Sequence, residues 1–292
     1  MLRLCVLCII LCLDSWAVEP ATNHRFFCGD YVQGKVFEVD RAGAVVRTLA
    51  AKQVDDLHLL PGGNLLFNDG SKVCEVDPTG TVVWSYQSKG EVFGVQRLAD
   101  GVTVINESWF GRIIEVDTSG TVLKTVTYVP AGTKPGHDIS RAVRKLDHGG
   151  YLVAMFSAGQ VLELDPQGAV VRTFPAKGGA HSVARLTNGN TLVAIADHAP
   201  KNPRLVELNP AGEVVWEVKN GDLPGIVLHF CAGFQVLDNG NILFTNWLGH
   251  GNLGKAPQVI EITRDKRVVW TYDEHKQIKT INAIVLASET QR

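Results

Sequence analysis

The sequence predicts an all-β fold, a six-bladed β-propeller built from four-stranded antiparallel blades. Three observations predict it: a tripeptide that recurs at the spacing of propeller blades, tight turns between apolar runs, and chain ends that complement each other. The tripeptide begins with Glu, and its six copies are 37, 40, 48, 44 and 54 residues apart. This spacing fits a four-stranded blade and is too long for most solenoid repeats. The glutamates are Glu38, Glu75, Glu115, Glu163, Glu207 and Glu261.

Each copy contains four strand signals in the same order. Two apolar runs flank a turn such as Asn188-Gly189, and Asn-Gly between apolar runs indicates a hairpin because a type I′ turn needs positive φ. The third run carries the glutamate and ends in Asp-x-x-Gly, as in residues 77–80, where Asp caps a turn and Gly closes it. The fourth run follows, as in residues 82–84. Because one site cannot need six equivalent glutamates, we expect them to form structural hydrogen bonds.

The two ends of the chain predict how the ring closes. Residues 25–49 supply three strands, whereas residues 281–286 form a single apolar run after the sixth blade. We therefore expect the C-terminal strand to complete the N-terminal blade, which removes the open edge between the first and last blades. The predicted organisation is a signal peptide (1–17), an N-terminal segment (18–24) and one propeller domain (25–292).

The first residues predict export. Arg3 precedes an apolar run at 4–13, and Ser15-Trp16-Ala17 places small residues where signal peptidase requires them. The run is about half of the roughly 20 residues that a membrane span needs. We expect cleavage after Ala17 and a secreted or periplasmic protein without a membrane span. The mature chain then keeps Cys28, Cys74 and Cys231, an odd number that permits at most one disulfide.

The repeat motif also points to a family. The form Asp-x-x-Gly-x-Val-Val-Trp, preceded by Asn-Gly-Asn-x-Leu, resembles PQQ-like and arylsulfotransferase-like β-propeller repeats over nearly all of residues 25–292. The resemblance implies the propeller fold. Quinoprotein dehydrogenases of this kind have eight-bladed rings, so the six copies argue against PQQ as a cofactor. Group transfer through a histidine nucleophile, as in arylsulfotransferases, is one function that the resemblance allows.

The residues that break the repeat indicate where a site lies. The long, dissimilar loops all connect strands at one end of the ring, which is where propellers and other rigid scaffolds carry binding residues. Three histidines, His137, His181 and His229, stand there at the start of successive innermost strands. We expect them to hold one divalent metal ion through neutral imidazole nitrogens. The alternative is that each histidine caps a strand or bonds a loop carbonyl.

Other side chains at this end are candidates for substrate contacts. Asp138 and Arg141 are expected to assist proton transfer or to stabilise charge, and the rings of Trp109 and Trp247 suit a sugar or another planar ligand. The remaining substrate-binding candidates are Glu107, His250 and Asn282, and Asp55, Asp56, Asp197 and His198 also lie in these loops.

These observations favour a metal-assisted lyase or hydrolase that acts on a carbohydrate-like substrate. A non-catalytic propeller that binds a small ligand or a protein partner is the alternative. The formal net charge of -2 and the absence of a Lys/Arg cluster in the sequence argue against a nucleic-acid partner, because phosphate binding relies on a basic surface.

Overall fold

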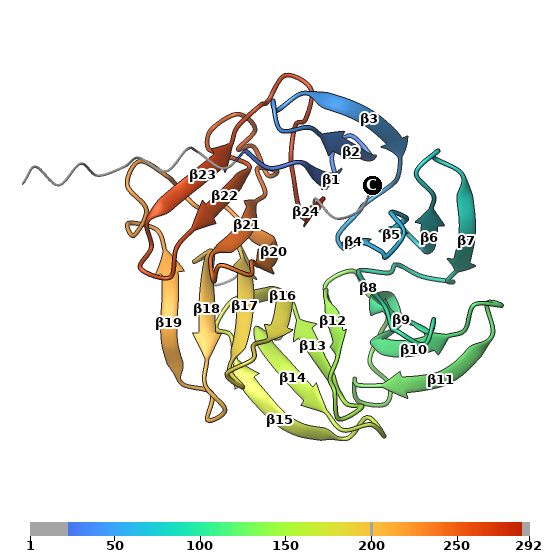
Figure 1. The fold of residues 1–292 in the computed structure, drawn as a ribbon. Coiled ribbons are helices and arrows are strands. Elements are labelled where there is room, and N and C mark those ends of the chain that lie inside the picture. Colours follow the sequence, from blue (N-terminus) through green and yellow to red (C-terminus); the bar gives the residue numbers. More distant parts are fainter. Residues whose placement is uncertain (1–22, 199–200, 288–292) are drawn as a thin grey trace, which may run out of the picture.

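The computed structural model describes residues 23–198 and 201–287, and it forms a ring of six four-stranded antiparallel sheets (Figure 1). Named from the innermost strand outwards, the first three sheets are β24 (Ala283–Leu286), β1 (Phe26–Asp30), β2 (Lys35–Val39) and β3 (Val45–Ala50); β4 (Leu57–Leu59), β5 (Leu65–Asp69), β6 (Lys72–Val76) and β7 (Val82–Gln87); and β8 (Gly94–Arg97), β9 (Thr103–Glu107), β10 (Arg112–Val116) and β11 (Val122–Thr127).

The other three sheets follow in chain order. They are β12 (Val143–Lys145), β13 (Tyr151–Met155), β14 (Gln160–Leu164) and β15 (Val170–Pro175); β16 (Gly179–Arg185), β17 (Thr191–Ala196), β18 (Arg204–Leu208) and β19 (Val214–Lys219); and β20 (Cys231–Val236), β21 (Ile242–Asn246), β22 (Val259–Ile262) and β23 (Val268–Tyr272). A short 3-10 helix, η1 (Ser108–Phe110), follows β9.

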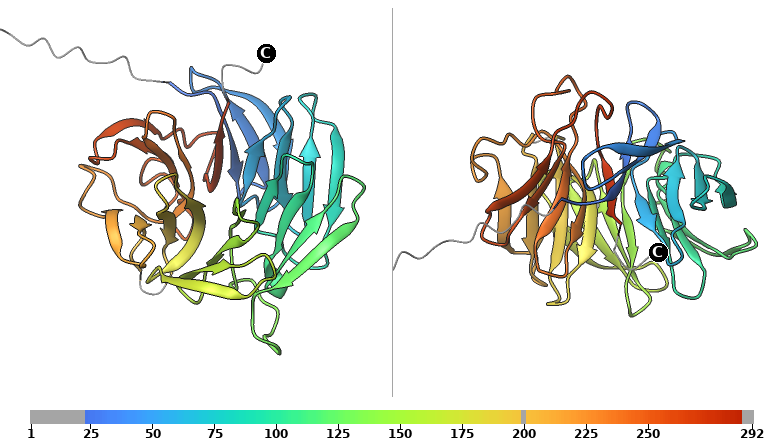
Figure 2. Two further views of the ribbon diagram at one scale, coloured as in Figure 1. Left: turned by 60° about the horizontal axis from the view of Figure 1, so that its bottom comes forward. Right: turned by 45° about the horizontal axis from the view of Figure 1, so that its top comes forward.

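The ring closes as the sequence predicts. Strand β24 pairs antiparallel with β1, in a register that places Phe26 opposite Leu286 and Cys28 opposite Ile284. The last strand of the chain therefore completes the first blade, and the tilted views show all six sheets around a common axis (Figure 2). The six-bladed propeller is confirmed.

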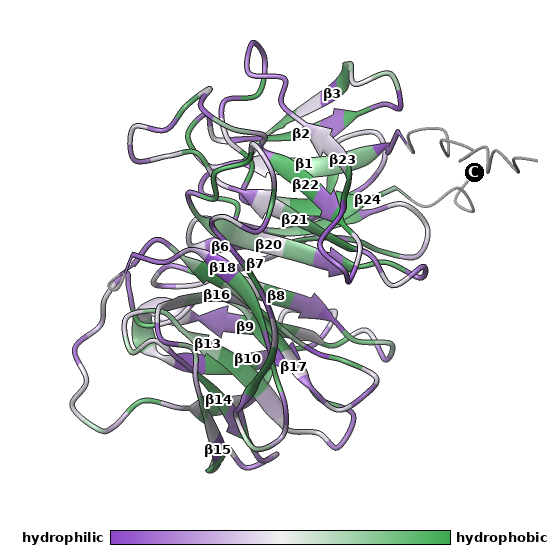
Figure 3. Ribbon diagram, turned by 90° about the vertical axis from the view of Figure 1, so that its left-hand side faces the viewer, coloured by the Kyte–Doolittle hydropathy of each residue, from purple (hydrophilic) through white to green (hydrophobic). Residues whose placement is uncertain are grey.

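The core consists of apolar side chains packed between neighbouring sheets. Leu192 and Ile260, from the fifth and sixth blades, belong to one buried cluster, and the strands are largely hydrophobic while the connections are mostly polar (Figure 3). Cys28, Cys74 and Cys231 are buried free thiols, so the core is not cross-linked by these cysteines. Within the described residues, no helix has the length and apolarity needed to cross a membrane.

Five of the six recurrent glutamates link their blade to the next one. Glu75 forms an ion pair with Arg97 of β8, 2.8 Å apart, and Glu163 pairs with Arg185 of β16, 2.5 Å apart. Glu115 pairs in the same way with Lys145 of β12. Glu207 and Glu261 also contact the next blade, but at other places: Arg264 between β22 and β23, and His24 before β1. Blade two carries Leu59 where a cation would stand, and Glu38 pairs instead with Arg25 and Arg47 of its own blade. The structural role expected for these glutamates is confirmed.

The Asn and Trp of the repeat motif lie beside these glutamates and their partners. The second Asn of Asn-Gly-Asn donates a hydrogen bond to the glutamate, as Asn190 does to Glu207 and Asn241 to Glu261, both at 2.6 Å. The cross-strand neighbour of Glu207 is Trp216, whose ring lies 4.4 Å from the guanidinium carbon of Arg264. The carboxylate, the amide and the stacked cation thus form one unit at each interface of this kind.

Removal of Glu207 tests this linkage. Glu207 is 2% exposed and accepts hydrogen bonds from Asn188, Asn190 and Arg264. We expect Glu207→Ala to lower the free energy of unfolding by about 2 to 4 kcal/mol, because it leaves buried donors unpaired. Urea denaturation measures the change, with Glu213→Ala as the exposed control. A loss no larger than that of the control would contradict the linkage.

Candidate functional site

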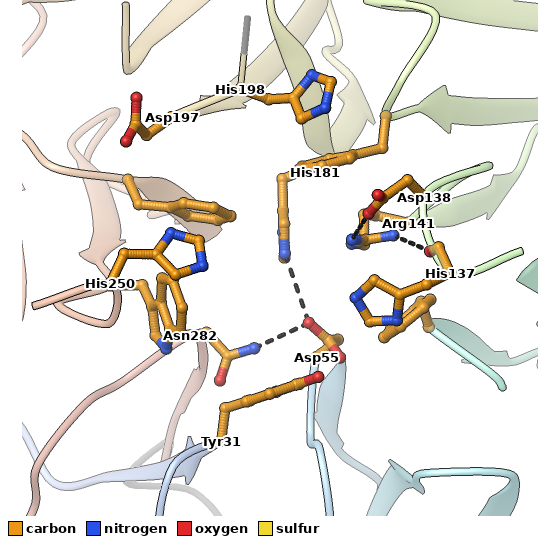
Figure 4. Close-up of a pocket in the computed structure, with 14 residues that line it drawn as sticks. Tyr31, Asp55, His137, Asp138, Arg141, His181, Asp197, His198, His250 and Asn282 are labelled. Carbon is orange, nitrogen blue, oxygen red and sulfur yellow. Dashed lines mark hydrogen bonds and ion pairs between the residues drawn. The ribbon is translucent and has the colours of Figure 1, made fainter. Parts of the chain in front are cut away.

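A cavity of about 350 Å³, which we call the mouth cavity, opens on the ring axis at the end where the innermost strands begin. Each blade contributes one side chain that stands at the start of its innermost strand. In chain order of the blades these are Asn282, Asp55, Phe93, Arg141, His181 and Phe230. The remaining lining residues come from loops and strand ends around them, and the volume falls in the range of small-molecule sites (Figure 4).

Three polar side chains meet deep in this cavity. Asn282 donates a hydrogen bond from Nδ2 to Oδ1 of Asp55 at 2.9 Å, and Nε2 of His181 lies 3.5 Å from the same oxygen (Figure 4). All three residues are buried, with 2% of Asn282, 7% of Asp55 and 3% of His181 exposed. Oδ2 of Asp55, Nδ1 of His181 and Oδ1 of Asn282 have no hydrogen-bond partner among the described residues. Unpaired buried polar atoms are costly, so their gathering in one cavity indicates a site rather than a core.

Buried asparagines hold the loops that carry these side chains. Asn68, at the end of β5, accepts hydrogen bonds from the backbone N–H groups of Asp55 and Asp56 through Oδ1, both at 2.9 Å. Its Nδ2 donates to the carbonyls of Gln53 and Val92, each at 2.7 Å. One side chain therefore satisfies four backbone groups at the entry to an innermost strand.

Asn246 does the same at the sixth blade. Its Oδ1 accepts from the backbone N–H groups of His229 and Phe230, and its Nδ2 donates to the carbonyls of Val227 and Pro257. The lining residues are thus fixed by backbone hydrogen bonds that the sheets themselves anchor.

Arg141 is held between two aromatic rings. Its guanidinium carbon lies 4.4 Å from the ring centre of Phe93 and 4.1 Å from that of Phe156, a cation–π geometry on both faces. Its NH2 group lies 3.1 Å from Oδ1 of Asp138, and NH1 donates to the carbonyl of His137 at 2.6 Å. Arg141 is 5% exposed, so its charge is fixed in place before any ligand arrives.

A second group of rings lines the opposite part of the cavity. Trp247 contacts Phe230 edge-on at 4.9 Å between centroids and Tyr31 at 6.2 Å. His250 stands over Trp247 at 4.8 Å, in a loop that holds it at φ 54°. Burial raises the pKa of Tyr31, and the Asp55 carboxylate raises it further, so Tyr31 remains a neutral phenol.

Asp55 also lines a smaller cavity further along the axis. This second cavity, of about 180 Å³, contains a group of ion pairs. In it Asp56 contacts Arg144 at 2.7 and 2.9 Å and His58 at 3.1 Å. Burial alone would raise the pKa of Asp56, but Arg144 and His58 together hold it well below its usual range.

The three histidines predicted as metal ligands do not form one group. His181 lies deep in the cavity, His137 stands at its rim with Nδ1 2.9 Å from Glu91, and His229 is not among the lining residues. Within residues 23–198 and 201–287, no three His, Cys, Asp or Glu side chains are placed as ligands of one metal ion. Burial lowers the pKa of His229, and Lys255 lowers it further.

The other predicted residues divide between the cavity and the surrounding loops. Asp138, Arg141, Trp247, His250 and Asn282 line the cavity. Glu107 does not: it is 1% exposed, pairs with Arg112 and accepts a hydrogen bond from Ser88. Trp109 lies in η1 outside the lining, where its carbonyl accepts from the backbone N–H of Gly136.

Four aromatic lining residues were not predicted from the sequence, namely Tyr31, Phe93, Phe156 and Phe230. A signal was present for two of them, because Phe93 and Phe230 occupy the strand-start position that singled out His181. Aromatic residues at such positions are more often part of the core, so the sequence alone does not mark these two as site residues.

Fold and cavity together define a six-bladed propeller with a small-molecule-sized cavity at one end of its axis. A family model described as outer membrane protein assembly factor BamB matches residues 32–199. Because this match spans more than half of the chain, the protein belongs to that family of PQQ-like propeller repeat proteins. Comparison with curated proteins gave no match.

Solved structures show the same fold. A protein of unknown function from Bacteroides caccae is 26% identical, with a TM-score of 0.81, and the alignment covers 91% of this chain and 100% of that one. A streptogramin B lyase is 12% identical, with a TM-score of 0.61 and coverage of 91% and 94%. Virginiamycin B lyase from Staphylococcus aureus is also 12% identical, with a TM-score of 0.57 and coverage of 87% and 85%. At 12% identity the likeness establishes the fold alone.

The ion pairs of Asp56 predict a pH-dependent stability. Because the folded-state pKa is lowered, the carboxylate stabilises the fold above its unfolded pKa of about 3.9, and this contribution is lost as the pH falls below that value. We expect Asp56→Asn to cost about 3 kcal/mol at neutral pH and clearly less at about pH 3. Urea denaturation at both pH values measures it, with exposed Asp273→Asn as control. A pH-independent difference would refute the assignment.

Proposed function

We propose that this chain is an exported enzyme that binds a small molecule in the mouth cavity and acts on it with His181 as general base. The observation that carries the proposal is the buried contact between Asp55 and His181, 3.5 Å apart, in a cavity that is open to solvent. Buried acid–base pairs in a cleft are typical of catalytic sites. The reaction class is a lyase or a hydrolase.

Asp55 fixes the chemical role of His181. A carboxylate beside Nε2 favours a proton on that nitrogen, which leaves the lone pair on Nδ1 and makes the imidazole a base. Asn282 donates a hydrogen bond from Nδ2 to Oδ1 of Asp55, so the orientation of the Asp55–His181 pair does not depend on the substrate. When His181 takes a proton from the substrate, the Asp55 charge stabilises the resulting imidazolium.

The lining residues favour proton abstraction over nucleophilic catalysis. No Ser, Thr or Cys is among the described residues that line the cavity, and these are the commonest nucleophiles for acyl transfer. The predicted metal ion is not used in this proposal, because no described group of ligands is arranged to hold it. A carbohydrate-like ligand remains compatible with the ring of Trp247.

The names of two structures with this fold agree with the lyase class. They are described as streptogramin B lyase and virginiamycin B lyase. Because their identity to this chain is only 12%, these names serve to choose compounds for a test. The non-catalytic alternative is a propeller that binds its ligand unchanged. The rings and unpaired polar atoms of the cavity serve that alternative equally well, so turnover must separate the two.

Substitution of His181 tests the proposal. The purified chain is incubated with a panel of oligosaccharides and streptogramin B-type compounds, and products are followed by mass spectrometry. A lyase yields products that together have the mass of the substrate, whereas a hydrolase adds one water. We expect His181→Gln to lower kcat at least about 100-fold, because a general base contributes this much, while KM changes little.

A matched control is available in His148→Gln, since His148 lies outside the cavity and its side chain is 57% exposed. This variant should retain the wild-type rate. Equal rates for His181→Gln and the wild type would remove His181 from the mechanism. Binding of a panel compound without turnover by the wild type would establish the non-catalytic alternative instead.

A further inference from the structure

The cavity carries more negative than positive charge. Asp55, Asp138 and Asp197 line it against the single guanidinium of Arg141, which leaves a formal charge of -2 when the histidines are neutral. Two of the carboxylates have cations nearby, because Asp138 contacts Arg141 at 3.1 Å and Asp197 lies 3.7 Å from the exposed Lys201. Asp55 has no arginine or lysine partner among the described residues; His181 and Asn282 contact it through one oxygen, Oδ1.

One half of the cavity shows how a cation is held there. Arg141 lies between the faces of Phe93 and Phe156 and against the carboxylate of Asp138. The positive charge is thus satisfied by aromatic faces and one carboxylate, a combination that also recognises cationic ligands in proteins. In this half the protein provides the cation itself.

The other half has the same kinds of group without a cation. The rings of Tyr31, Phe230 and Trp247 contact one another edge-on in pairs, and none of the recorded cation–π contacts of the described residues involves them. Beside them lie Oδ2 of Asp55 and Oδ1 of Asn282, two buried acceptors without a hydrogen-bond donor. Figure 4 shows Asn282 and Asp55 side by side above Tyr31, next to His250.

We propose that this half of the cavity binds the protonated amine of a small, ring-containing ligand. The ammonium group donates to the carboxylate of Asp55 through Oδ2, and the ring or alkyl part packs on Tyr31, Phe230 and Trp247. Oδ1 of Asp55 is already used by Asn282 and His181, so ligand binding and orientation of the base use different oxygens of one carboxylate. This inference rests on the proposed function, to which it adds the class of substrate.

The nature of the acceptors supports an amine over an anion or a neutral ring. A carboxylate and an amide oxygen accept hydrogen bonds but cannot donate them, so an anionic group at this place would meet two unpaired acceptors and a like charge. A neutral ring would fill the aromatic half but leave the buried carboxylate oxygen unsatisfied, which costs free energy. A protonated amine satisfies the carboxylate oxygen and the aromatic faces at once.

Three probes with the same ring and different charge test the proposal. Benzylamine, which is protonated at neutral pH, benzyl alcohol and benzoate are titrated into the full chain by isothermal calorimetry. We expect benzylamine to bind about tenfold more tightly than benzyl alcohol, because a charge-assisted hydrogen bond and cation–π contacts are added. Benzoate should bind most weakly of the three.

The variant Asp55→Asn tests whether the Asp55 carboxylate recognises the positive charge of benzylamine. The amide has nearly the same shape and no charge, so we expect this variant to bind benzylamine and benzyl alcohol within about twofold of each other. The control is Asp238→Asn, which removes one negative charge from an exposed turn outside the cavity and should keep the tenfold preference. Thermal unfolding of both variants shows whether they are folded.

The outcomes separate this proposal from the enzymatic one. Equal affinity for benzylamine and benzyl alcohol, or tighter binding of benzoate, would overturn the amine site while leaving a functional cavity. Retention of the preference in Asp55→Asn would overturn the role of that carboxylate. If none of the three probes binds, the amine site is also refuted, whereas turnover that depends on His181 would still support the proposed reaction.

Discussion

The ring is held together by carboxylates between its blades. In four of the six blades a glutamate on the third strand pairs with an arginine or lysine of the following blade, in a fifth it contacts His24, and in the remaining one it pairs with two arginines of its own blade. Apolar clusters between neighbouring sheets provide most of the packing. The charged contacts between blades then fix how each sheet is oriented relative to the next. The geometry of the mouth cavity follows from these orientations.

The site uses the same sheets in a different way. Along the blade interfaces the recurrent glutamates are paired, whereas the cavity is lined by Asp55, His181 and Asn282, each with an atom that has no hydrogen-bond partner among the described residues. Buried asparagines such as Asn68 hold the backbone at the strand starts, so the cost of these unpaired atoms does not unravel the loops that bear them. A rigid scaffold that tolerates local instability is the usual setting of a binding or catalytic site.

The fold could be predicted from the sequence because every level of the pattern repeats. Glu207 and Asn190 recur together since one binds the other, and the lone apolar run at 281–286 has a single place to pair. The site was harder to predict because it depends on small differences between the repeats. The innermost strands of blades five and six carry register shifts, at 180–182 and 231–234. His181 lies within the first shift, whereas His229 lies before the second, two residues ahead of β20. Spacing along the chain does not reveal such shifts.

Residue type also misled the prediction at particular positions. Glu107 breaks the repeat at the end of β9, yet its cross-strand neighbour Arg112 neutralises it within the protein. Phe156 looks like core, yet one face of its ring covers Arg141 at the cavity. Asp55 and Asp56 are identical in type and adjacent, and only the direction of successive side chains along an extended backbone sends one to the mouth cavity and leaves the other among cations.

The cavity takes a side chain at the start of the innermost strand from every blade, and one of these, Asn282, directly precedes β24, the strand that closes the ring. Synthesis proceeds from the N-terminus, so a growing chain lacks the complete site until Asn282 and β24 have been translated. A fragment that lacks the final strand has neither a closed ring nor the amide that holds Asp55. Ligand binding is therefore a property of the finished molecule, and a strand supplied as a separate peptide is the smallest piece whose return would restore it.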